Sequence, residues 1–130
     1  MENIKKEKRK VMLVDDEVAF LSLMKLNLQE RGNYAVLTLS NARDIISKVH
    51  SFKPDIIILD MIMPHIGGLE VCQMLNDDPV GERIPLIILS ALSKDLDRLK
   101  AYKLGVLDYI TKPVNTDMLI SKIERIFSSR

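Results

Sequence analysis

The 130-residue chain has a single cysteine, Cys72, no tryptophan, and aromatic residues at only 5% of its positions. One cysteine excludes an internal disulfide framework and a metal or redox site of the CxxC type. No apolar run approaches the roughly 18–20 residues that span a membrane, and the basic N-terminus lacks the longer apolar stretch of a signal peptide. These absences predict a soluble, cytoplasmic protein without contact to a membrane.

The chain also lacks a clear excess of either charge, because 19 basic and 18 acidic side chains leave a net charge of +1. Residues 1–10 carry a net +3, and the rest of the chain carries a net −2. A nucleic-acid-binding body spreads lysine and arginine over one face, so we expect no direct nucleic-acid binding. We divide the chain into a basic N-terminal arm, residues 1–8, and one domain, residues 9–130.

Four short apolar runs and a weaker fifth have the length of strands, and isoleucine and valine dominate the clearest of them. Continuously apolar runs indicate strands that are covered on both faces, as in a parallel sheet. The expected strands are residues 11–14, 35–39, 56–59, 86–89 and 106–110.

Longer amphipathic segments lie between these runs. Gly32 is a natural stop for the first helix, and Ser93 and Gly105 fit the start and end of the fourth. The expected helices are residues 16–31 (or 17–31), 41–51, 68–76, 93–104 and 115–127. Strands that alternate with helices through right-handed crossovers predict an α/β fold, a doubly wound five-stranded parallel sheet with five helices on its two faces.

Polar side chains stand at the ends of the expected strands, which is where ligands bind in open parallel sheets. They are Asp15, Asp16 and Glu17 after the first run, Asp60 after the third, Ser90 after the fourth and Lys112 after the fifth. The topology predicts that carboxylates, a hydroxyl and an ammonium meet in one shallow site.

Clustered carboxylates repel each other and need a cation. Oxygen ligands without histidine or cysteine suit Mg²⁺, or Mn²⁺ in its place, and such sites often also hold phosphate. Asp60 would be the nucleophile that forms an aspartyl-phosphate. Lys112 and Ser90 would hold the phosphoryl oxygens, which supplies the positioning and charge neutralisation that phosphoryl transfer requires.

The motifs at the strand ends occur in a specific order. They are Val14-Asp15-Asp16-Glu17, Asp60-Met61-Ile62-Met63-Pro64 followed by Gly67-Gly68-Leu69-Glu70, Leu89-Ser90-Ala91, and Tyr109-Ile110-Thr111-Lys112-Pro113. In these motifs the chain resembles the receiver domain of two-component response regulators (the CheY-like superfamily) over roughly residues 8–128. The resemblance implies a flavodoxin-like sheet with strand order 2-1-3-4-5.

The resemblance also implies a set of metal ligands around the phosphoacceptor, Asp60. Asp16 would bind Mg²⁺ directly and Asp15 mainly through water. Asp60 and the backbone carbonyl of Ile62 would complete the protein ligands. The alternative for Asp15 and Asp16 is an N-cap pair that favours the helix dipole.

Three further roles follow from the resemblance. Ser90 would be the switch hydroxyl and Tyr109 the switch aromatic, whose ring changes rotamer with Ser90. Lys112 would pair with the phosphoryl group and, before phosphorylation, with the Asp60 carboxylate, and the Lys112-Pro113 bond would be cis. The alternative for Tyr109 is an ordinary strand residue packed at the sheet edge.

The implied function is a phosphorylation-activated signalling switch, which is not a conventional enzyme and catalyses only its own phosphorylation and dephosphorylation. A sensor histidine kinase or phosphotransfer domain would donate the phosphoryl group to Asp60. The fourth helix, fifth strand and fifth helix would present the change to a downstream target or output domain. A homodimer through the fourth and fifth helices stays open, as does the choice between a stand-alone receiver and one domain of a larger regulator.

Three other classes of protein fit less well. A phosphatase with an aspartyl nucleophile usually has a carboxylate two residues later, where this chain has Ile62. A flavin or nucleotide binder would need a phosphate-cradling loop, and neither GxGxxG nor GxxxxGK[ST] occurs. A DNA-binding regulator would need a helix-turn-helix, and the sequence ends directly after the fifth helix.

The first helix has more apolar residues than one face needs. Its expected core stripe is Phe20, Leu23, Met24 and Leu28. Val18, Leu21 and Leu26 lie off this stripe. Either the helix is buried more widely, or these residues form a docking patch for the helical domain of a phosphodonor.

Overall fold

The computed structural model describes residues 7–91 and 95–129, and within them five parallel strands form one sheet in the order β2-β1-β3-β4-β5. The strands are β1 (Lys10–Val14), β2 (Ala35–Leu39), β3 (Ile56–Asp60), β4 (Leu86–Ser90) and β5 (Asp108–Thr111). The fold class and the strand order are those that the sequence and the resemblance predicted.

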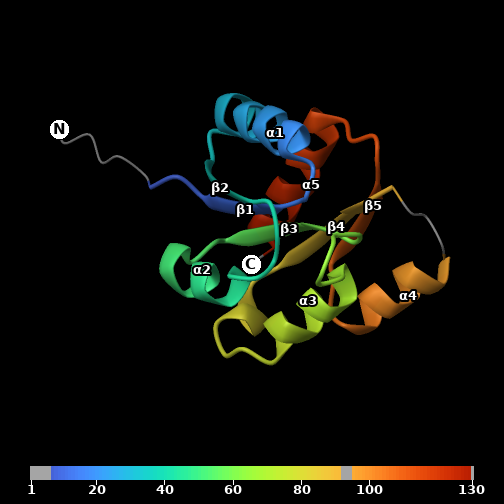
Figure 1. Ribbon diagram of the computed structural model, residues 1–130. Helices are drawn as coiled ribbons and strands as arrows, with labels where there is room; N and C mark the ends of the chain where they lie inside the picture. The colour runs from blue at the N-terminus through green and yellow to red at the C-terminus, as the bar shows by residue number, and fades with distance from the viewer. Residues whose placement is uncertain (1–6, 92–94, 130) are drawn as a thin grey trace.

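Helices cover both faces of the sheet (Figure 1). They are α1 (Val18–Arg31) and α5 (Thr116–Ser128) on one face, with α2 (Ile45–Phe52), α3 (Gly68–Asn76) and α4 (Asp95–Lys103) on the other, and a short 3₁₀ turn, η1 (Gly81–Arg83), lies ahead of β4. The expected range of α3 is confirmed. The expected N-cap of α4, Ser93, lies outside the described residues.

The helix α2 begins four residues later than the sequence predicted. The side chain of Asn41 accepts a hydrogen bond from the backbone N–H of Arg43, two residues further on (3.0 Å). Such a local bond forms a turn that competes with helix. Ala42 is still buried, because the turn packs it against the same core as Ile45 and Val49.

Two apolar cores lie on the two faces of the sheet, because successive side chains of a strand point to opposite faces. In β1, Val11 and Leu13 pack under α1 and α5, whereas Met12 and Val14 pack against α2, α3 and α4. The inner strands follow the same alternation. Every residue of β3 and β4 is buried, which explains why these strands appear as continuous apolar runs in the sequence.

The predicted core stripe of α1 is wrong at one position. Leu23, assigned to the core, is 60% exposed. Leu21, for which wider burial of the helix and a docking patch were both open, is only 5% exposed, which fits wider burial. The helix packs on β2 and α5 through Leu21, Met24 and Leu28. Val18 and Leu26, for which the same two alternatives were open, are exposed.

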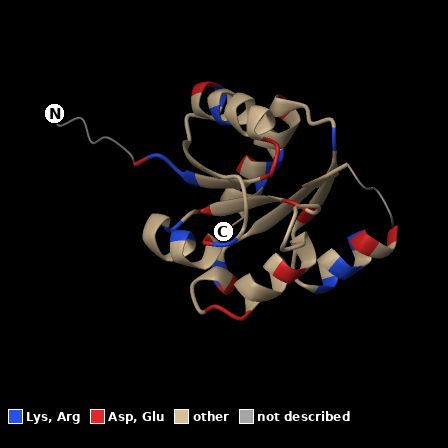
Figure 2. Ribbon diagram, viewed as in Figure 1, with Lys and Arg blue, Asp and Glu red and all other residues tan. Residues whose placement is uncertain are grey.

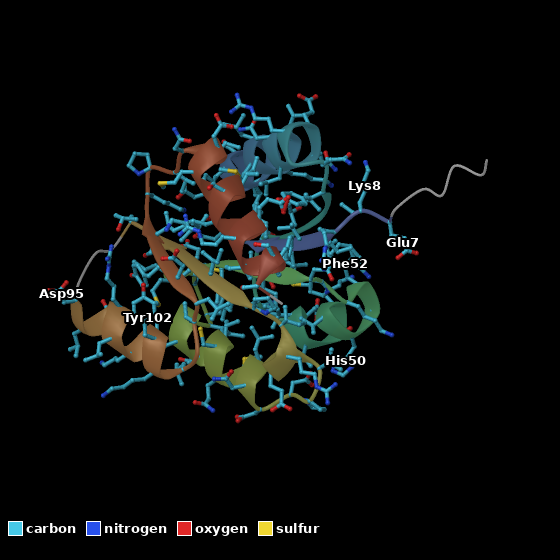
Figure 3. All side chains as sticks on the ribbon, turned by 180° about the vertical axis from the view of Figure 1, so that it is seen from behind. Glu7, Lys8, His50, Phe52, Asp95 and Tyr102 are labelled. Atoms are coloured by element: carbon cyan, nitrogen blue, oxygen red, sulfur yellow. The ribbon has the colours of Figure 1, made fainter. Side chains whose placement is uncertain are left out.

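The two basic residues that precede and begin β1 belong to the fold. The guanidinium carbon of Arg9 lies 4.8 Å from the ring centroid of Phe127, and the backbone N–H of Lys10 donates to Asp55 Oδ2 at 2.7 Å. Glu7 and Lys8 are exposed ahead of them (Figure 3). The division into an arm of residues 1–8 and a domain of residues 9–130 stays a prediction.

Charged residues occur mainly in the helices, in the loops and at the ends of the strands, and the strands themselves are largely uncharged (Figure 2). The one cysteine, Cys72, is buried in α3. None of the described helices has both the length and the apolar character needed to span a bilayer.

Candidate functional site

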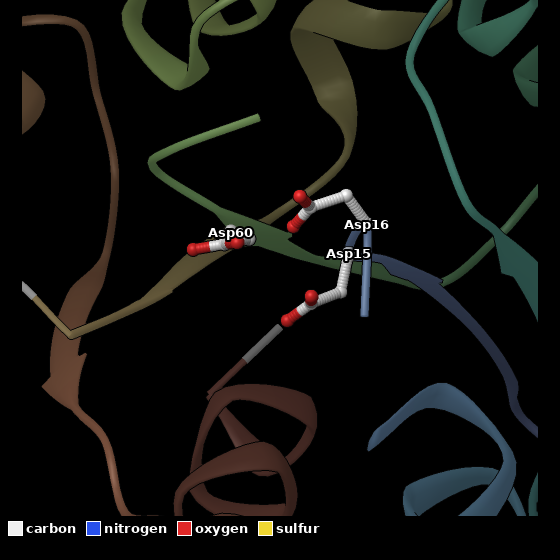
Figure 4. A group of neighbouring side chains, drawn as sticks. All are labelled: Asp15, Asp16 and Asp60. Atoms are coloured by element: carbon white, nitrogen blue, oxygen red, sulfur yellow. The ribbon is translucent and has the colours of Figure 1, made fainter. Parts of the chain in front are cut away.

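Three carboxylates meet at the carboxyl edge of the sheet. Asp15, Asp16 and Asp60 each offer one oxygen, and these oxygens lie within 4.8 Å of one another (Figure 4). The strands β1 and β3 are neighbours with Val14 opposite Leu59, so the residues that follow these two positions lie side by side. The structure therefore brings together the three carboxylates that the sequence placed at strand ends.

Local hydrogen bonds fix two of these carboxylates. Asp15 Oδ1 accepts from the backbone N–H of Glu17 at 2.9 Å, and the backbone N–H of Asp15 donates to Leu39 O in β2. Asp60 Oδ1 accepts a long bond from the backbone N–H of Ile62 at 3.4 Å. Asp15 and Asp60 are buried, whereas Asp16 is exposed at the rim.

Lys112, from the loop after β5, reaches into this cluster. Its Nζ lies 2.7 Å from Asp15 Oδ2, 3.5 Å from Glu17 Oε1 and 4.0 Å from Asp60 Oδ2. The sequence predicted a pair with Asp60, but Asp15 is the closer partner. Asp15 is the most deeply buried of the carboxylates, and a buried charge gains most from a direct opposite charge.

Two residues around Lys112 were given no role in the site by the sequence. The carboxylate of Glu17 is one, although it stood within the acidic motif after the first strand. Phe20 is the other, because its ring centroid lies 4.4 Å from Lys112 Nζ and so holds the ammonium through a cation–π contact. From the sequence, Phe20 was predicted only to pack in the core, because it belongs to the apolar stripe of the first helix.

Among the residues that the structure describes, the site holds less positive than negative charge. Burial raises the pKa of Asp60 to about 6, and the charge of Asp15 and then that of Asp16 add to the rise, while Lys112 and the Ile62 N–H oppose it. Burial alone would lower the pKa of Lys112, but its bond to Asp15 and the nearby carboxylates raise it. Lys112 therefore stays an ammonium at neutral pH and cannot by itself balance the carboxylates.

This donor set fits a hard divalent cation. The pocket has a volume of about 250 Å³ and is lined by Asp16, Glu17, Asp60, Ile62, Ala91 and Lys112. Among these described residues there is neither histidine nor cysteine, so the available ligands are oxygens. Oxygen ligands and an accessible rim suit Mg²⁺, which keeps several waters.

Ser90 lies beside the cluster at the end of β4. Its neighbour Leu89 is opposite Asp60 in the ladder, and Ser90 itself is opposite Thr111 of β5. The backbone carbonyl of Ser90 accepts from the Lys112 N–H at 2.8 Å. The ends of β3, β4 and β5 are therefore held in one line, with Ser90 fully buried between them.

Tyr109 of β5 is also buried, with 4% of its surface exposed. It packs in the core on the α2, α3 and α4 face. The guanidinium carbon of Arg98 in α4 lies 5.0 Å from its ring centroid. The Lys112–Pro113 peptide bond is cis, as the resemblance implied.

The loop after Asp60 is held by a close backbone approach at Gly68, the first residue of α3. Its N–H donates to Met61 O at 2.8 Å. A Cβ at Gly68 would lie 2.7 Å from Met61 Cα, which real structures do not tolerate. Glycine at this position therefore lets α3 start directly against the residue that follows Asp60.

A model of the response regulator receiver domain family matches residues 11–124, a span that contains every site residue described above. The chain belongs to this family. Receiver domains are the signalling modules of two-component systems, and the receiver described here has the acidic cluster at the expected strand ends.

Two curated relatives are response regulators of greater length. The receiver is 33% identical over 118 residues to the alkaline phosphatase synthesis transcriptional regulatory protein PhoP of Bacillus subtilis. The aligned region covers 91% of this chain and 48% of PhoP. The receiver is 34% identical over 119 residues to the probable transcriptional regulator ycf27 of Guillardia theta, covering 92% of this chain and 45% of ycf27. The receiver thus spans less than half the length of these relatives.

Solved structures show the same fold. A response regulator from Desulfuromonas acetoxidans superposes with a TM-score of 0.83 at 28% identity, covering 92% of this chain and 97% of that one. The chemotaxis protein CheY4 of Vibrio cholerae superposes with a TM-score of 0.84 at 24% identity, covering 91% of this chain and 98% of that one. This second similarity is one of fold.

Proposed function

We propose that this receiver is a phosphorylation-activated switch in the cytoplasm, which accepts a phosphoryl group from a phosphohistidine on the carboxylate of Asp60. The observation that supports this most directly is the geometry of the site. Asp60 lies within 4.8 Å of two further carboxylates, with the Lys112 ammonium 4.0 Å away. A nucleophile, a cation site and a fixed positive charge therefore lie in one pocket.

In the proposed transfer, an Asp60 oxygen attacks phosphorus and the phosphorus–nitrogen bond breaks, so the electron pair returns to the donor imidazole. Lys112 lies close enough to pair with a phosphoryl oxygen once Asp60 is modified. Asp16 would hold Mg²⁺, or Mn²⁺, directly and Asp15 through water, with Asp60 and the Ile62 carbonyl as the other ligands. When bound, the cation would neutralise the charge that carboxylate and phosphoryl oxygens bring together.

Phosphorylation would shift an existing equilibrium between two conformations. Ser90 would donate its hydroxyl to a phosphoryl oxygen, and Tyr109, on the neighbouring strand, would change rotamer with it. The face made of α4, β5 and α5 would carry the change to a target protein or an output domain. The receiver would catalyse only its own phosphorylation and dephosphorylation.

We propose that the phosphodonor, a sensor histidine kinase or a phosphotransfer domain, docks on α1 beside the acidic pocket. A groove of about 450 Å³ runs there between α1 and the loop after β5. It is lined by apolar side chains, by Lys112 and by three other polar residues, Glu17, Asn27 and Thr116. Leu23 lines the groove and is exposed. Val18 and Leu26 of the same helix are also exposed but lie outside the groove. Leu21 is excluded from this surface because it is buried.

The central test is incubation with acetyl phosphate and Mg²⁺, followed by intact mass measurement. We expect one phosphoryl addition that is acid-stable and base-labile. The addition should be lost in Asp60→Ala and when the divalent cation is removed by a chelator. An unmodified parent chain, or an addition that survives Asp60→Ala, would overturn the proposal.

A further inference from the structure

Arg98 links α4 to β5 through two contacts made by one guanidinium group. Its Nη2 donates a hydrogen bond to Thr111 Oγ1 at 2.9 Å. Its Cζ lies 5.0 Å from the Tyr109 ring centroid, inside the roughly 6 Å over which a cation–π contact is effective. Thr111 precedes Lys112 and lies opposite Ser90. One side chain of α4 therefore contacts both the proposed switch aromatic and the β5 residue that lies opposite Ser90.

Apolar burial holds α4 only weakly. Ala101 is its one buried residue among those described, whereas α3 has four and α5 has three. Leu96 and Leu99 are exposed, and Asp95 and Tyr102 lie at one edge of the molecule (Figure 3). Because packing of an apolar face is what usually fixes a helix on a sheet, the Arg98 contacts carry an unusually large share of the attachment of α4.

The position of Arg98 also has a cost. Its Nε is buried and has no hydrogen-bond partner in the described part of the chain. A buried donor without a partner opposes this position of the side chain, whereas the Tyr109 ring and Thr111 favour it. Opposing contributions of this kind bring two positions close in free energy, which a two-state switch requires.

We propose that Arg98 is a positioning residue of the switch. In the unphosphorylated chain it keeps the ring of Tyr109 buried, and on phosphorylation it carries the movement of β5 to α4. The second half rests on the proposed function, because it needs a phosphoryl group on Asp60. The first half is a property of the unphosphorylated chain and can be tested without any phosphodonor.

The test of the first half labels the full chain with 3-fluorotyrosine and measures how strongly a soluble paramagnetic agent relaxes each ¹⁹F resonance. Tyr34, 3% exposed on the other face of the sheet, and Tyr102, 45% exposed, are internal references. Tyr109→Phe assigns the third resonance. In Arg98→Met we expect about a tenfold shift of the Tyr109 equilibrium towards the exposed ring, as for a lost, partly buried cation–π contact.

Three variants make this result specific. Lys100→Met removes an exposed charge from the same helix and should leave Tyr109 protected. Arg98→Lys keeps the charge and should restore most of the protection, which a purely steric role would not. Thr111→Val removes only the hydroxyl and should cause a smaller rise in the exposure of the Tyr109 ring. If Arg98→Met also exposes Tyr34, and so disturbs the fold, the Thr111→Val variant provides the test instead. A Tyr109 that stays as protected as Tyr34 in both Arg98→Met and Thr111→Val overturns the proposal.

The second half is tested by adding acetyl phosphate and Mg²⁺ and following the backbone amide shifts of Asp95–Lys103. In Arg98→Met we expect the response of α4 to fall by about half or more, because its main link to β5 is gone. The phosphoryl addition at Asp60 should be unchanged. An undiminished α4 response overturns this half, whereas a parent chain that takes no phosphoryl group refutes the proposed function and leaves the Tyr109 result standing.

Discussion

At the scale of single residues, Lys112 decides the charge balance of the pocket. Its ammonium contacts carboxylates of Asp15, Glu17 and Asp60 within 4.0 Å, and Asp16 adds a further negative charge at the rim. Among the residues that the structure describes, one cation faces four carboxylates, so the site without a metal ion is repulsive. The pKa of Asp60 is raised by burial and by this repulsion.

This repulsion predicts that Asp60→Asn stabilises the metal-free chain at neutral pH. The carboxyl of Asp60 has a pKa of about 6 in the folded chain, against an ordinary 3.8. A raised carboxyl pKa means that the folded state binds the proton more tightly, so stability is lost as the pH rises through about 6. We expect Asp60→Asn to raise the free energy of unfolding by about 1–2 kcal/mol, measured with urea at pH 7.5 in the presence of a chelator.

Two controls distinguish this electrostatic effect from better packing. The advantage of Asp60→Asn should disappear towards pH 4, where the wild-type carboxyl is protonated in the folded chain. Added Mg²⁺ should stabilise the wild-type chain more than the variant. An advantage that stays constant from pH 4 to pH 7.5 would contradict the assignment.

The sequence predicted the positions of the site residues better than their contacts. Asp15, Asp60 and Ser90 follow short, continuously apolar strands, so the parallel topology determines where they lie. The partner of Lys112 could not be predicted, because four rotatable bonds let its ammonium reach several carboxylates. The contact of Arg98 with Tyr109 follows no periodic pattern and needs the position of α4 relative to β5.

At the scale of elements, α1 shows the limit of helical periodicity. Apolar residues occur on nearly all sides of this helix, so the pattern does not determine which side faces the sheet. Contacts with β2 and α5 turn Leu21 inward and leave Leu23 at the groove. Where the pattern is narrow, as in α3, the predicted range Gly68–Asn76 and the observed range agree.

The exposed side of α1 gives a prediction about the phosphodonor. Leu23→Arg should slow phosphoryl transfer from the cognate kinase by about tenfold, as for the loss of an apolar contact at the centre of an interface. Phosphorylation by acetyl phosphate should be unchanged, because the pocket itself is untouched. The measurement is the initial rate of transfer from each donor.

Gln29→Arg is the matched control, because it adds the same charge at another exposed position of α1. It should transfer at the parental rate. If Leu23→Arg also receives the phosphoryl group from the kinase at the parental rate, α1 is not the docking surface.

The junction between β3 and α3 gives a prediction about stability. Gly68→Ala would place a methyl group 2.7 Å from Met61 Cα, and the forced backbone shift should cost about 1–3 kcal/mol in urea unfolding. Because Met61 directly follows Asp60, phosphorylation by acetyl phosphate should also slow. Gly67→Ala meets no atom within 4 Å and should leave both quantities nearly unchanged. Equal stabilities of the two variants would contradict the close approach.

At the scale of the whole molecule, the α4 side carries an apolar surface that residues 7–91 and 95–129 leave exposed. Its exposed apolar residues are Leu96, Leu99, Tyr102 and Leu107. The far face of the sheet has α1 and α5 packed together. We propose that a second copy of the chain covers this α4 surface when Asp60 is phosphorylated.

This proposal predicts that the parent chain sediments as a monomer alone and as a dimer with acetyl phosphate and Mg²⁺. Leu99→Asp should weaken the dimer by at least about tenfold, because it places a charge in an apolar contact. Leu26→Asp makes the same change at an exposed position of α1, on the other face, and should still dimerise. A parent chain that carries the phosphoryl group and stays monomeric would contradict the proposal.

The strand order has a consequence for the order in which the molecule can assemble during synthesis. β1 pairs with both β2 and β3, so the first three strands can form a sheet as soon as residue 60 is available. That early sheet would already hold Asp15, Asp16 and Asp60, whereas Lys112 lies 97 residues after Asp15. Non-local contacts form late because the intervening loop must first close. A growing chain thus gathers its mutually repelling carboxylates early and receives the ammonium that relieves them only with the final strand, so the site becomes complete in the last steps of folding.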